Sequence, residues 1–242
     1  MKIIADTHTH TIMSGHAHST ALENITEAKR KGLKFIAITD HTGKMPASPD
    51  ETYFICMWSA LPDSCDGVYI LRGCEANILD ENGTLDISDK ALGRLEWRIA
   101  SIHALITKPM DFERHTRLWL NIAKNPLIDV IGHSGEEDYK YDYERVIPEF
   151  KKYGKVVEII ASSERSRPSC IKYCIEIARL CAKYEVPLVL SSDAHFASFV
   201  GEVDKAIEIV TKAGVPEDLI LNLSEKRFAD FLEKKLDRKF PI

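Results

Sequence analysis

Short apolar runs alternate with amphipathic stretches along almost the whole chain. Apolar runs bounded by glycine, proline or charged residues are typical of buried strands, whereas apolar residues three and four positions apart indicate helices. Strands are predicted at residues 3–10, 35–39, 68–73, 97–102, 127–132, 155–160 and 186–191. Helices are predicted at residues 20–31, 53–60, 88–95, 111–124, 142–153, 168–184, 202–213 and 224–235. The Asn82-Gly83 pair also suggests a small hairpin from Ala76 to Ile87.

The strands and helices alternate with a repeat of about thirty residues. This order predicts an α/β protein whose parallel sheet closes, or nearly closes, into a barrel. Residues 219–223 could add an eighth strand, but that run is short. The alternative is a doubly wound open sheet, which tends to concentrate its site at one switch point, whereas polar residues follow six of the seven predicted strands here. We expect a single domain spanning residues 1–242.

Composition and net charge limit the cellular locations and binding partners that we expect for this protein. Hydrophobic residues make up 45% of the 242, enough for a barrel-sized core, and the first residues are too polar for a secretory signal. No apolar run approaches the ~18 residues of a membrane span, so we expect a cytoplasmic protein without membrane contact. The six cysteines form no CxxC pair and are expected to be reduced packing residues. A net charge of −5 argues against a nucleic-acid partner, and the sequence leaves open whether the chain forms a homo-oligomer.

The first predicted strand ends in a histidine-rich segment, Asp6-Thr7-His8-Thr9-His10, and His16 follows after a Ser-Gly turn. Because side chains two positions apart point to one face of a strand, Asp6, His8 and His10 are expected on the same face. Neutral imidazoles at such a spacing are typical of metal ligands. A histidine-rich surface loop would have the same local sequence, so only the rest of the chain can distinguish a metal site from such a loop.

Histidines and carboxylates follow the other predicted strands in the same way. They are His41 after the second strand, Glu75 after the third, His103 after the fourth, His133 after the fifth, and Asp193 with His195 after the seventh. In a parallel barrel the C-terminal ends of the strands meet at one face, so these side chains and the N-terminal histidines should meet there. One ion takes about four to six ligands, so nine nitrogen and oxygen ligands predict two or three ions. Imidazole-rich ligation favours Zn, Fe or Mn over Mg or Ca.

Two aspartates and two histidines lie at the margin of this pattern. Asp6 and Asp40 are expected either to hold the second ring nitrogens of ligating histidines or to be ordinary cap and turn residues. His18 lies close to the N-terminal segment and could join the site. His115 falls in the middle of a predicted helix, where we expect it to be solvated.

Taken together, these motifs resemble those of the PHP (polymerase and histidinol phosphatase) family, and most closely its YcdX-like phosphatase branch. The motifs are His8-Thr9-His10, Thr39-Asp40-His41, Gly73-Cys74-Glu75-Ala76-Asn77, His103, His133 and Ser192-Asp193-Ala194-His195. The resemblance runs nearly the whole chain and implies a distorted TIM-like (β/α)7 barrel. The chain departs from the branch at Ala104, where an acidic residue is common, and at Ser134, where proline is common.

The resemblance also implies three divalent transition-metal ions, with zinc favoured and manganese or iron as alternatives. One ion is implied on His8, His10, Glu75 and Asp193, a second on Glu75, His103 and His133, and a third on His16, His41 and His195. Glu75, Asp193 and His195 are predicted to be the catalytic residues among them. Three divalent ions would leave the pocket strongly positive even with two ligand carboxylates, which suits a small phosphorylated substrate.

The predicted chemistry is hydrolysis of a phosphate monoester, by in-line attack of a metal-bridging hydroxide. Arg165 and Arg167, after the sixth strand, are predicted to bind the phosphate, because guanidinium grips phosphate through two donors. The alternative is that Arg165 and Arg167 are solvated arginines on the surface of the protein.

Three other functions compete with this prediction. A phosphodiesterase or exonuclease would use the same metals but needs a groove for a second nucleotide. An amidohydrolase-type metal hydrolase also has an HxH motif after strand one, but it commonly has a modified lysine where this chain has His103. The third is a non-enzymatic metal-binding role.

Overall fold

The computed structural model describes residues 1–161 and 168–241. Its main feature is a sheet of parallel strands in the order β1-β2-β4-β5-β6-β7-β8. The strands are β1 (Ala5–Thr9), β2 (Phe35–Ile38), β4 (Val68–Asn77), β5 (Trp97–Ser101), β6 (Val130–Ile131), β7 (Val156–Ile160) and β8 (Leu188–Ser191). A short strand, β3 (Ser64–Cys65), pairs antiparallel with β4. These parallel strands correspond one to one to the seven predicted from the apolar runs.

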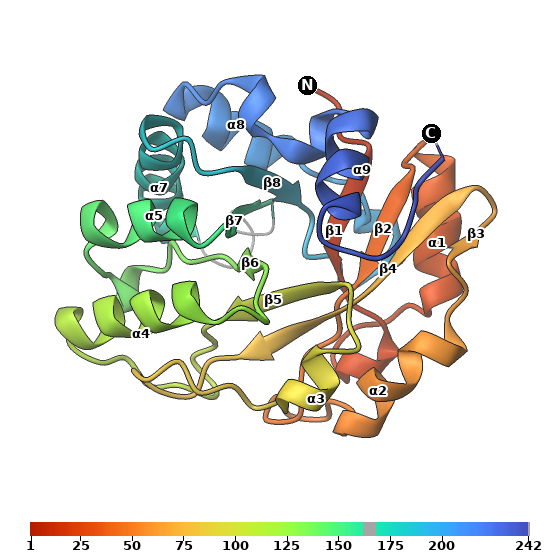
Figure 1. Cartoon of the computed structure of the whole chain (residues 1–242), viewed down its shortest axis with the longest axis horizontal. Helices are drawn as coiled ribbons and strands as arrows, with labels where there is room; N and C mark the ends of the chain where they lie inside the picture. Colours follow the sequence, from red (N-terminus) through yellow and green to blue (C-terminus); the bar gives the residue numbers. More distant parts are fainter. Residues whose placement is uncertain (162–167, 242) are drawn as a thin grey trace.

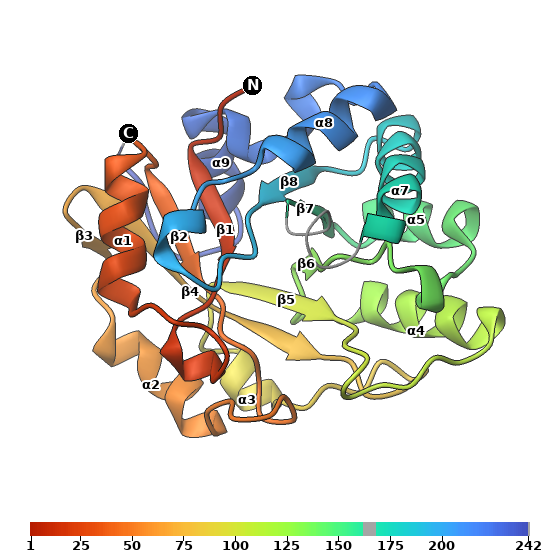
Figure 2. The same ribbon diagram turned by 180° about the vertical axis from the view of Figure 1, so that it is seen from behind.

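Helices surround this sheet on the outside and, at α9 (Glu225–Glu233), cover the N-terminal end of the barrel, as Figures 1 and 2 show. They are α1 (Ala21–Arg30), α2 (Glu51–Ala60), α3 (Asp89–Leu92), α4 (Phe112–Lys124), α5 (Tyr143–Lys152), α7 (Ile171–Lys183), α8 (Asp204–Ala213) and α9 (Glu225–Glu233). Shorter 3-10 turns are η1 (Ile12–Ser14), η2 (Glu137–Tyr139), η3 (Pro168–Cys170), η4 (Ala197–Phe199), η5 (Glu217–Leu219) and η6 (Leu221–Leu223). Among the helices of the described residues, none is both long and apolar enough to cross a membrane.

The sheet nearly closes into a barrel between β1 and β8. Thr9 forms an isolated parallel bridge with Ala194, just past the end of β8. Nearer the start of these strands, the buried amide of Asn222 accepts from the Leu190 backbone and donates to the carbonyls of Ala5 and Leu190. The segment expected as a possible eighth strand contributes one bridge, from Ile220 to Leu188, and otherwise forms 3-10 turns. A side chain therefore occupies the seam that an eighth strand would fill.

Two apolar layers hold the barrel together. An outer layer lies between the strands and the surrounding helices, where the amphipathic helices bury their apolar faces. An inner layer takes side chains from every parallel strand, among them Phe35, Leu71 and Trp97, and packs them against Phe228 and Leu232 of α9. Helix α9 therefore fills the N-terminal end of the barrel and leaves the C-terminal end for polar side chains.

Strand β4 differs most from its prediction. The apolar run predicted a strand ending at Gly73, but β4 continues to Asn77, so that Glu75 lies inside the strand rather than after it. The first half of β4 pairs with β2, and Gly73 to Asn77 pair with β5. Partners on both sides explain why the strand outlasts its apolar run. The predicted hairpin shrinks to one antiparallel bridge between Ile78 and Leu85.

Candidate metal centre

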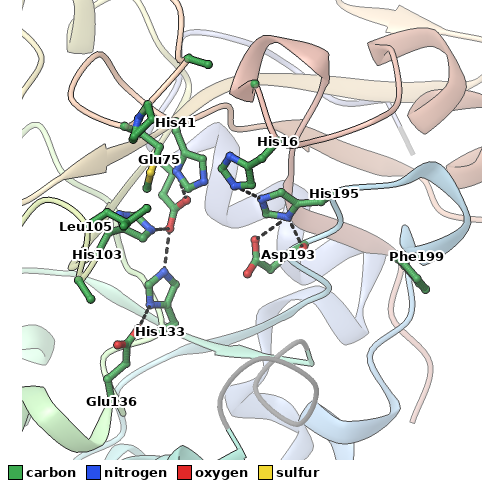
Figure 3. Close-up of a pocket in the computed structure, with 15 residues that line it drawn as sticks. His16, His41, Glu75, His103, Leu105, His133, Glu136, Asp193, His195 and Phe199 are labelled. Carbon is green, nitrogen blue, oxygen red and sulfur yellow. Dashed lines mark hydrogen bonds and ion pairs between the residues drawn. The ribbon is translucent and has the colours of Figure 1, made fainter.

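The C-terminal ends of the strands surround a pocket of about 960 Å³. Figure 3 shows that imidazole and carboxylate side chains point into it from several strands and loops. Its lining includes predicted ligands from all six polar motifs, namely His16, His41, Glu75, His103, His133, Asp193 and His195. His8 and His10 lie beneath them and are fully buried.

Glu75 and Asp193 meet the two histidines of the first motif at the base of the pocket. His8 Nε2 lies 3.0 Å from His10 Nε2 and 3.3 Å from Glu75 Oε2. Asp193 Oδ1 lies 3.6 Å from His8 Nε2 and 3.2 Å from His10 Nε2. Four ligand atoms from three strands thus converge on one point, the arrangement that the resemblance implies for the first ion.

The other oxygen of Glu75 faces a second pair of histidines. Glu75 Oε1 lies 2.9 Å from His133 Nε2 and 3.3 Å from His103 Nε2. His41 approaches from the opposite side, with its Nδ1 2.8 Å from Glu75 Oε2. The carboxylate of Glu75 therefore lies at the centre of the whole cluster, with imidazole nitrogens next to both of its oxygens.

The histidines implied for a third ion are close but less compact. His16 Nε2 lies 2.9 Å from His195 Nε2, and the rings of His16 and His41 are 5.0 Å apart between centroids. Three sets of residues place one ligand atom each within 4.8 Å of one another: His10, His41 and His195; His8, His10 and Glu75; and His41, Glu75 and His103. The first set includes His10 where the resemblance implies His16, so the membership of this third group stays a prediction.

The ring nitrogens that face away from the cluster are held by acceptors. His8 Nδ1 lies 2.9 Å from the buried carboxylate of Glu158, and His103 Nδ1 lies 2.7 Å from Asn77 Oδ1. His10 Nδ1 contacts Ser14 Oγ, whose own proton goes to Asp40. These acceptors fix the proton on the outer nitrogen. In the neutral form of each ring, the inner Nε2 then presents a lone pair to the pocket.

This tautomer pattern fits a bound cation. With the protons on the outer nitrogens, the inner atoms of His8, His10, Glu75 and Asp193 are all acceptors, and adjacent acceptors repel one another. Glu75 Oε2 and His41 Nδ1 are also buried without a hydrogen bond, although they lie 2.8 Å apart. One shared proton cannot satisfy so many lone pairs, whereas divalent ions can.

The pKa values of the cluster favour the forms that bind metal. Burial opposes the ionised form of Glu75, but His103, His8 and His41 outweigh it and hold the pKa of Glu75 well below its usual range. Burial lowers the pKa of His10 well below its usual range, and it lowers that of His103 as well. Ionised carboxylates and neutral imidazoles are the states in which these side chains ligate metal.

His8 differs from His10 and His103 in the direction of its pKa shift. Burial disfavours its protonated form, but the nearby Glu158, Glu75 and Asp193 outweigh this and raise the pKa of His8 well above the usual range. The excess negative charge around this ring is the electrostatic feature that a bound cation would neutralise.

The backbone is strained at two of the predicted ligands. His133 has φ +24° and Asp193 has φ +55°, conformations that residues other than glycine adopt at a cost of roughly 1–3 kcal/mol. The loop that carries Asp193 is held by Asp6, which accepts from Ser192 and from the Gly201 backbone. The hydrogen bonds of Asp6 therefore fix this loop and not a histidine ring, contrary to one prediction. Asp40 does support a histidine ring, but only indirectly: it accepts from Ser14 Oγ, which in turn contacts His10 Nδ1.

The remaining predicted residues lie elsewhere. Arg165 and Arg167, the predicted phosphate-binding residues, fall outside the described residues. His18 is exposed to solvent. The expectation that His115 is solvated is wrong: its side chain is buried, with Nε2 accepting from the Met110 backbone and Nδ1 next to the Lys140 carbonyl.

Three partners of the cluster were missed from the sequence: Glu158, Asn77 and Glu136. Glu158 could have been noticed, because it is a lone carboxylate in the apolar strand β7. Glu136 contacts His133 Nδ1 at 3.3 Å and follows it by three residues, but nothing in the sequence distinguishes it from a surface acid.

Similarity to other proteins extends over most of the chain. The model of the PHP domain matches residues 6–213. A probable phosphatase of Thermoanaerobacter sp. (strain X514) is 42% identical over 237 residues, covering 97% of this chain and 96% of the relative. A probable phosphatase of Caldanaerobacter subterraneus subsp. tengcongensis is 43% identical over 240 residues, covering 98% and 94%.

A solved structure shares the fold at lower identity. The histidinol phosphate phosphatase of Lactococcus lactis subsp. lactis, complexed with zinc, L-histidinol and phosphate, superposes with a TM-score of 0.61 at 16% identity. The match covers 89% of this chain and 95% of that one. The predicted TIM-like barrel is therefore confirmed, and so is the predicted family. This chain belongs to the PHP domain family.

Proposed function

We propose that the protein is a metal-dependent phosphatase that hydrolyses phosphate monoesters at a trinuclear centre. The observation that carries the proposal is the position of Glu75, whose two oxygens face different groups of histidines. A buried carboxylate shared in this way is suited to bridge ions held a few ångströms apart. The names of the relatives, which are probable phosphatases, support the same reaction.

The residues in place would hold the ions as the resemblance implies. His8, His10, Glu75 and Asp193 would hold the first ion, Glu75 with His103 and His133 the second, and His16 with His41 and His195 the third. Bound divalent ions would supply a water of lowered pKa as the nucleophile and positive charge for the phosphoryl oxygens. Zinc suits this set of imidazoles and carboxylates, and manganese and iron are the alternatives.

The side chains of the chain itself position these groups and exclude bulk water. Glu75, Asp193 and His195 line the pocket that the reacting phosphoryl group would enter. Glu158 and Asn77 orient the rings of His8 and His103. Arg165 and Arg167 remain predicted phosphate-binding residues.

Metal analysis together with a substrate screen tests this proposal. The purified protein, loaded with zinc or manganese, is assayed against phosphate monoesters, phosphate diesters and amides. We expect turnover of monoesters, with label from H2(18)O appearing in the released phosphate. Preferential turnover of diesters or amides would contradict the proposal, and so would label in the released alcohol.

The variant Glu75→Ala tests the shared ligand. Because one side chain would contribute to two ions, we expect the bound metal to fall by more than one equivalent and kcat/KM for monoesters to fall by at least about 100-fold. Glu208→Ala, at an exposed position on α8, is the matched control and should keep full metal content. Unchanged metal content in Glu75→Ala would contradict the assignment.

A further inference from the structure

The pocket is much larger than the phosphoryl group that the metal centre would hold. Its volume of about 960 Å³ is at the upper end of the ~300–1,000 Å³ of pockets that enclose whole small molecules. The polar ligands occupy its base. The remaining space above them must therefore receive the alcohol part of a phosphate monoester.

The mouth of this space is apolar. Apart from the predicted ligands, Gly15 and Glu136, the lining of the pocket consists of Met45, Pro46, Ala47, Ala104, Leu105 and Phe199. Leu105 is 73% exposed and Phe199 is 38% exposed, although large apolar side chains generally gain by leaving water. Both side chains would lose this exposure if the alcohol part of a substrate packed against them.

Leu105 and Phe199 lie on opposite sides of the ligand cluster. Leu105 follows His103 by two residues and lies on the His103 side of the pocket, whereas Phe199 lies beyond Asp193 and His195 (Figure 3). A substrate in the pocket would therefore have Leu105 on one side of the cluster and Phe199 on the other. Each can contact the alcohol without touching the phosphate.

Charged side chains in the lining restrict the alcohol further. Within the part of the chain that the structure describes, the charged residues lining the pocket are Glu75, Glu136 and Asp193, with no lysine or arginine among them. A second anionic group on the alcohol would meet the carboxylate of Glu136. The described walls thus disfavour bisphosphates and phosphorylated acids.

We propose that the alcohol part of the substrate carries no anionic group and is largely apolar, and that Leu105 and Phe199 are specificity-determining residues that bind it. The proposal rests on the phosphatase function proposed above. In this proposal the apolar lining determines which monoesters bind well. The ligand cluster catalyses the hydrolysis that all monoesters share.

A series of n-alkyl phosphates from ethyl to hexyl tests the proposal on the metal-loaded protein. The leaving groups in this series differ little in chemistry, so a change in kcat/KM reports contact with the alkyl chain. We expect kcat/KM to rise by about two- to fourfold per added methylene, mainly through a lower KM, because each buried methylene contributes the same contact before and during reaction. Glycerol phosphate and phosphoglycerate serve as polar and anionic comparisons and should be poorer than hexyl phosphate.

The variants Leu105→Ser and Phe199→Ser remove the apolar contacts one at a time. In each, we expect the ratio of kcat/KM for hexyl phosphate to that for ethyl phosphate to fall by at least about fivefold. Phe112→Ser is the matched control, because Phe112 is 50% exposed at the start of α4 and does not line the pocket. It should keep the wild-type ratio. Because all three residues are exposed, these substitutions should leave the fold intact.

The possible outcomes separate this proposal from the proposed function. Turnover of monoesters with no dependence on alkyl length, or a preference for phosphoglycerate, would overturn the specificity proposal alone. So would an alkyl dependence that both serine variants retain. Absence of turnover with every monoester would instead overturn the proposed function, and the specificity proposal with it.

Discussion

At the scale of single residues, the contact between Glu158 and His8 is central to the site. Glu158 lies in β7 and is buried, and its Oε1 is 2.9 Å from His8 Nδ1. Because the carboxylate accepts the outer proton of the ring, it selects the tautomer whose Nε2 faces Glu75 and Asp193. Its role is therefore to position a predicted ligand rather than to touch the substrate.

The variant Glu158→Gln tests this role. An amide keeps the size of the side chain but removes the negative charge beside His8. We expect the affinity for the most tightly bound ion to fall by about 10- to 100-fold, as is typical when a buried partner of a ligating histidine is lost. Competition with a chelator measures this affinity. Excess metal should restore much of the activity, whereas a purely structural defect would not respond to metal.

Particular residues show how far the sequence could predict the site. The predicted ligands lie together because strand ends in a parallel barrel meet at one face, a rule that requires no knowledge of contacts. For Asp6 the sequence left two roles open, and its hydrogen bonds to Ser192 and Gly201 favour that of a loop-fixing residue. His115 was expected to be solvated because its side chain is polar. Its spacing to Leu118, Trp119 and Ile122 would have placed it on the buried face of α4.

At the scale of secondary structure, Asn222 replaces strand pairing at the seam of the barrel. Its side-chain amide serves the Leu190 backbone on one side and the Ala5 carbonyl on the other. Strands β1 and β8, which it joins, lead directly to His10 and Asp193. The distance between these ligands thus depends on a hydrogen-bonded side chain in η6.

We expect Asn222→Ala to lower the free energy of unfolding by roughly 3–5 kcal/mol. The substitution leaves one backbone donor and two carbonyls buried without their partners, and each such group costs about 1–3 kcal/mol. Chemical denaturation followed by circular dichroism measures the loss. Asn82→Ala, at an exposed turn, is the matched control and should change stability by less than about 0.5 kcal/mol. Equal stability of the two variants would show that the seam does not depend on Asn222.

At the scale of the whole molecule, the two ends of the barrel carry different chemistry. The C-terminal end holds the ligand cluster, whereas the N-terminal end holds a group of cations around the carboxylate of Asp129. Arg98 and Lys235 pair directly with Asp129, and Lys155 donates to the carbonyls of Asn125 and Ile128 nearby. Burial lowers the pKa of Lys155 to about 8 and that of Lys235 to about 8.

These lysines predict how stability depends on pH. Between pH ~8 and the ordinary lysine pKa of ~10.4, the unfolded chain binds more protons than the folded one, so their contribution to stability rises with pH across this range. Lys155→Met removes one of the two groups. We expect the free energy of unfolding of the wild type to gain on the order of 1–2 kcal/mol more than that of the variant between pH 8 and 10. Denaturation at a series of pH values measures both.

Lys212→Met, at an exposed position on α8, is the control for loss of a positive charge. Its stability should follow the wild-type pH dependence. Parallel pH profiles for the wild type and Lys155→Met would contradict the prediction, whatever their absolute difference in stability.

The order of the strands and helices could be predicted from the sequence, but the way in which the barrel closes could not. The order of strands follows from short connections between neighbouring parallel strands, so apolar runs and helical spacing sufficed. The seam at Asn222 and the packing of Phe228 against Trp97 join residues far apart in the chain. No local pattern encodes such contacts. The extra length of β4 likewise depends on pairing with two neighbours.

The seam between β1 and β8 also has a consequence for folding during synthesis on the ribosome. A nascent chain exposes His8 and His10 early, but Asp193 and Asn222 emerge only after nearly two hundred further residues have been made. Until then the two histidines lack the carboxylate of Asp193, which would complete a tight site, and the barrel lacks its closing hydrogen bonds. Incomplete chains should therefore bind metal weakly. Tight binding at the centre therefore requires that Asp193 and Asn222 have left the ribosome and folded against the first strand.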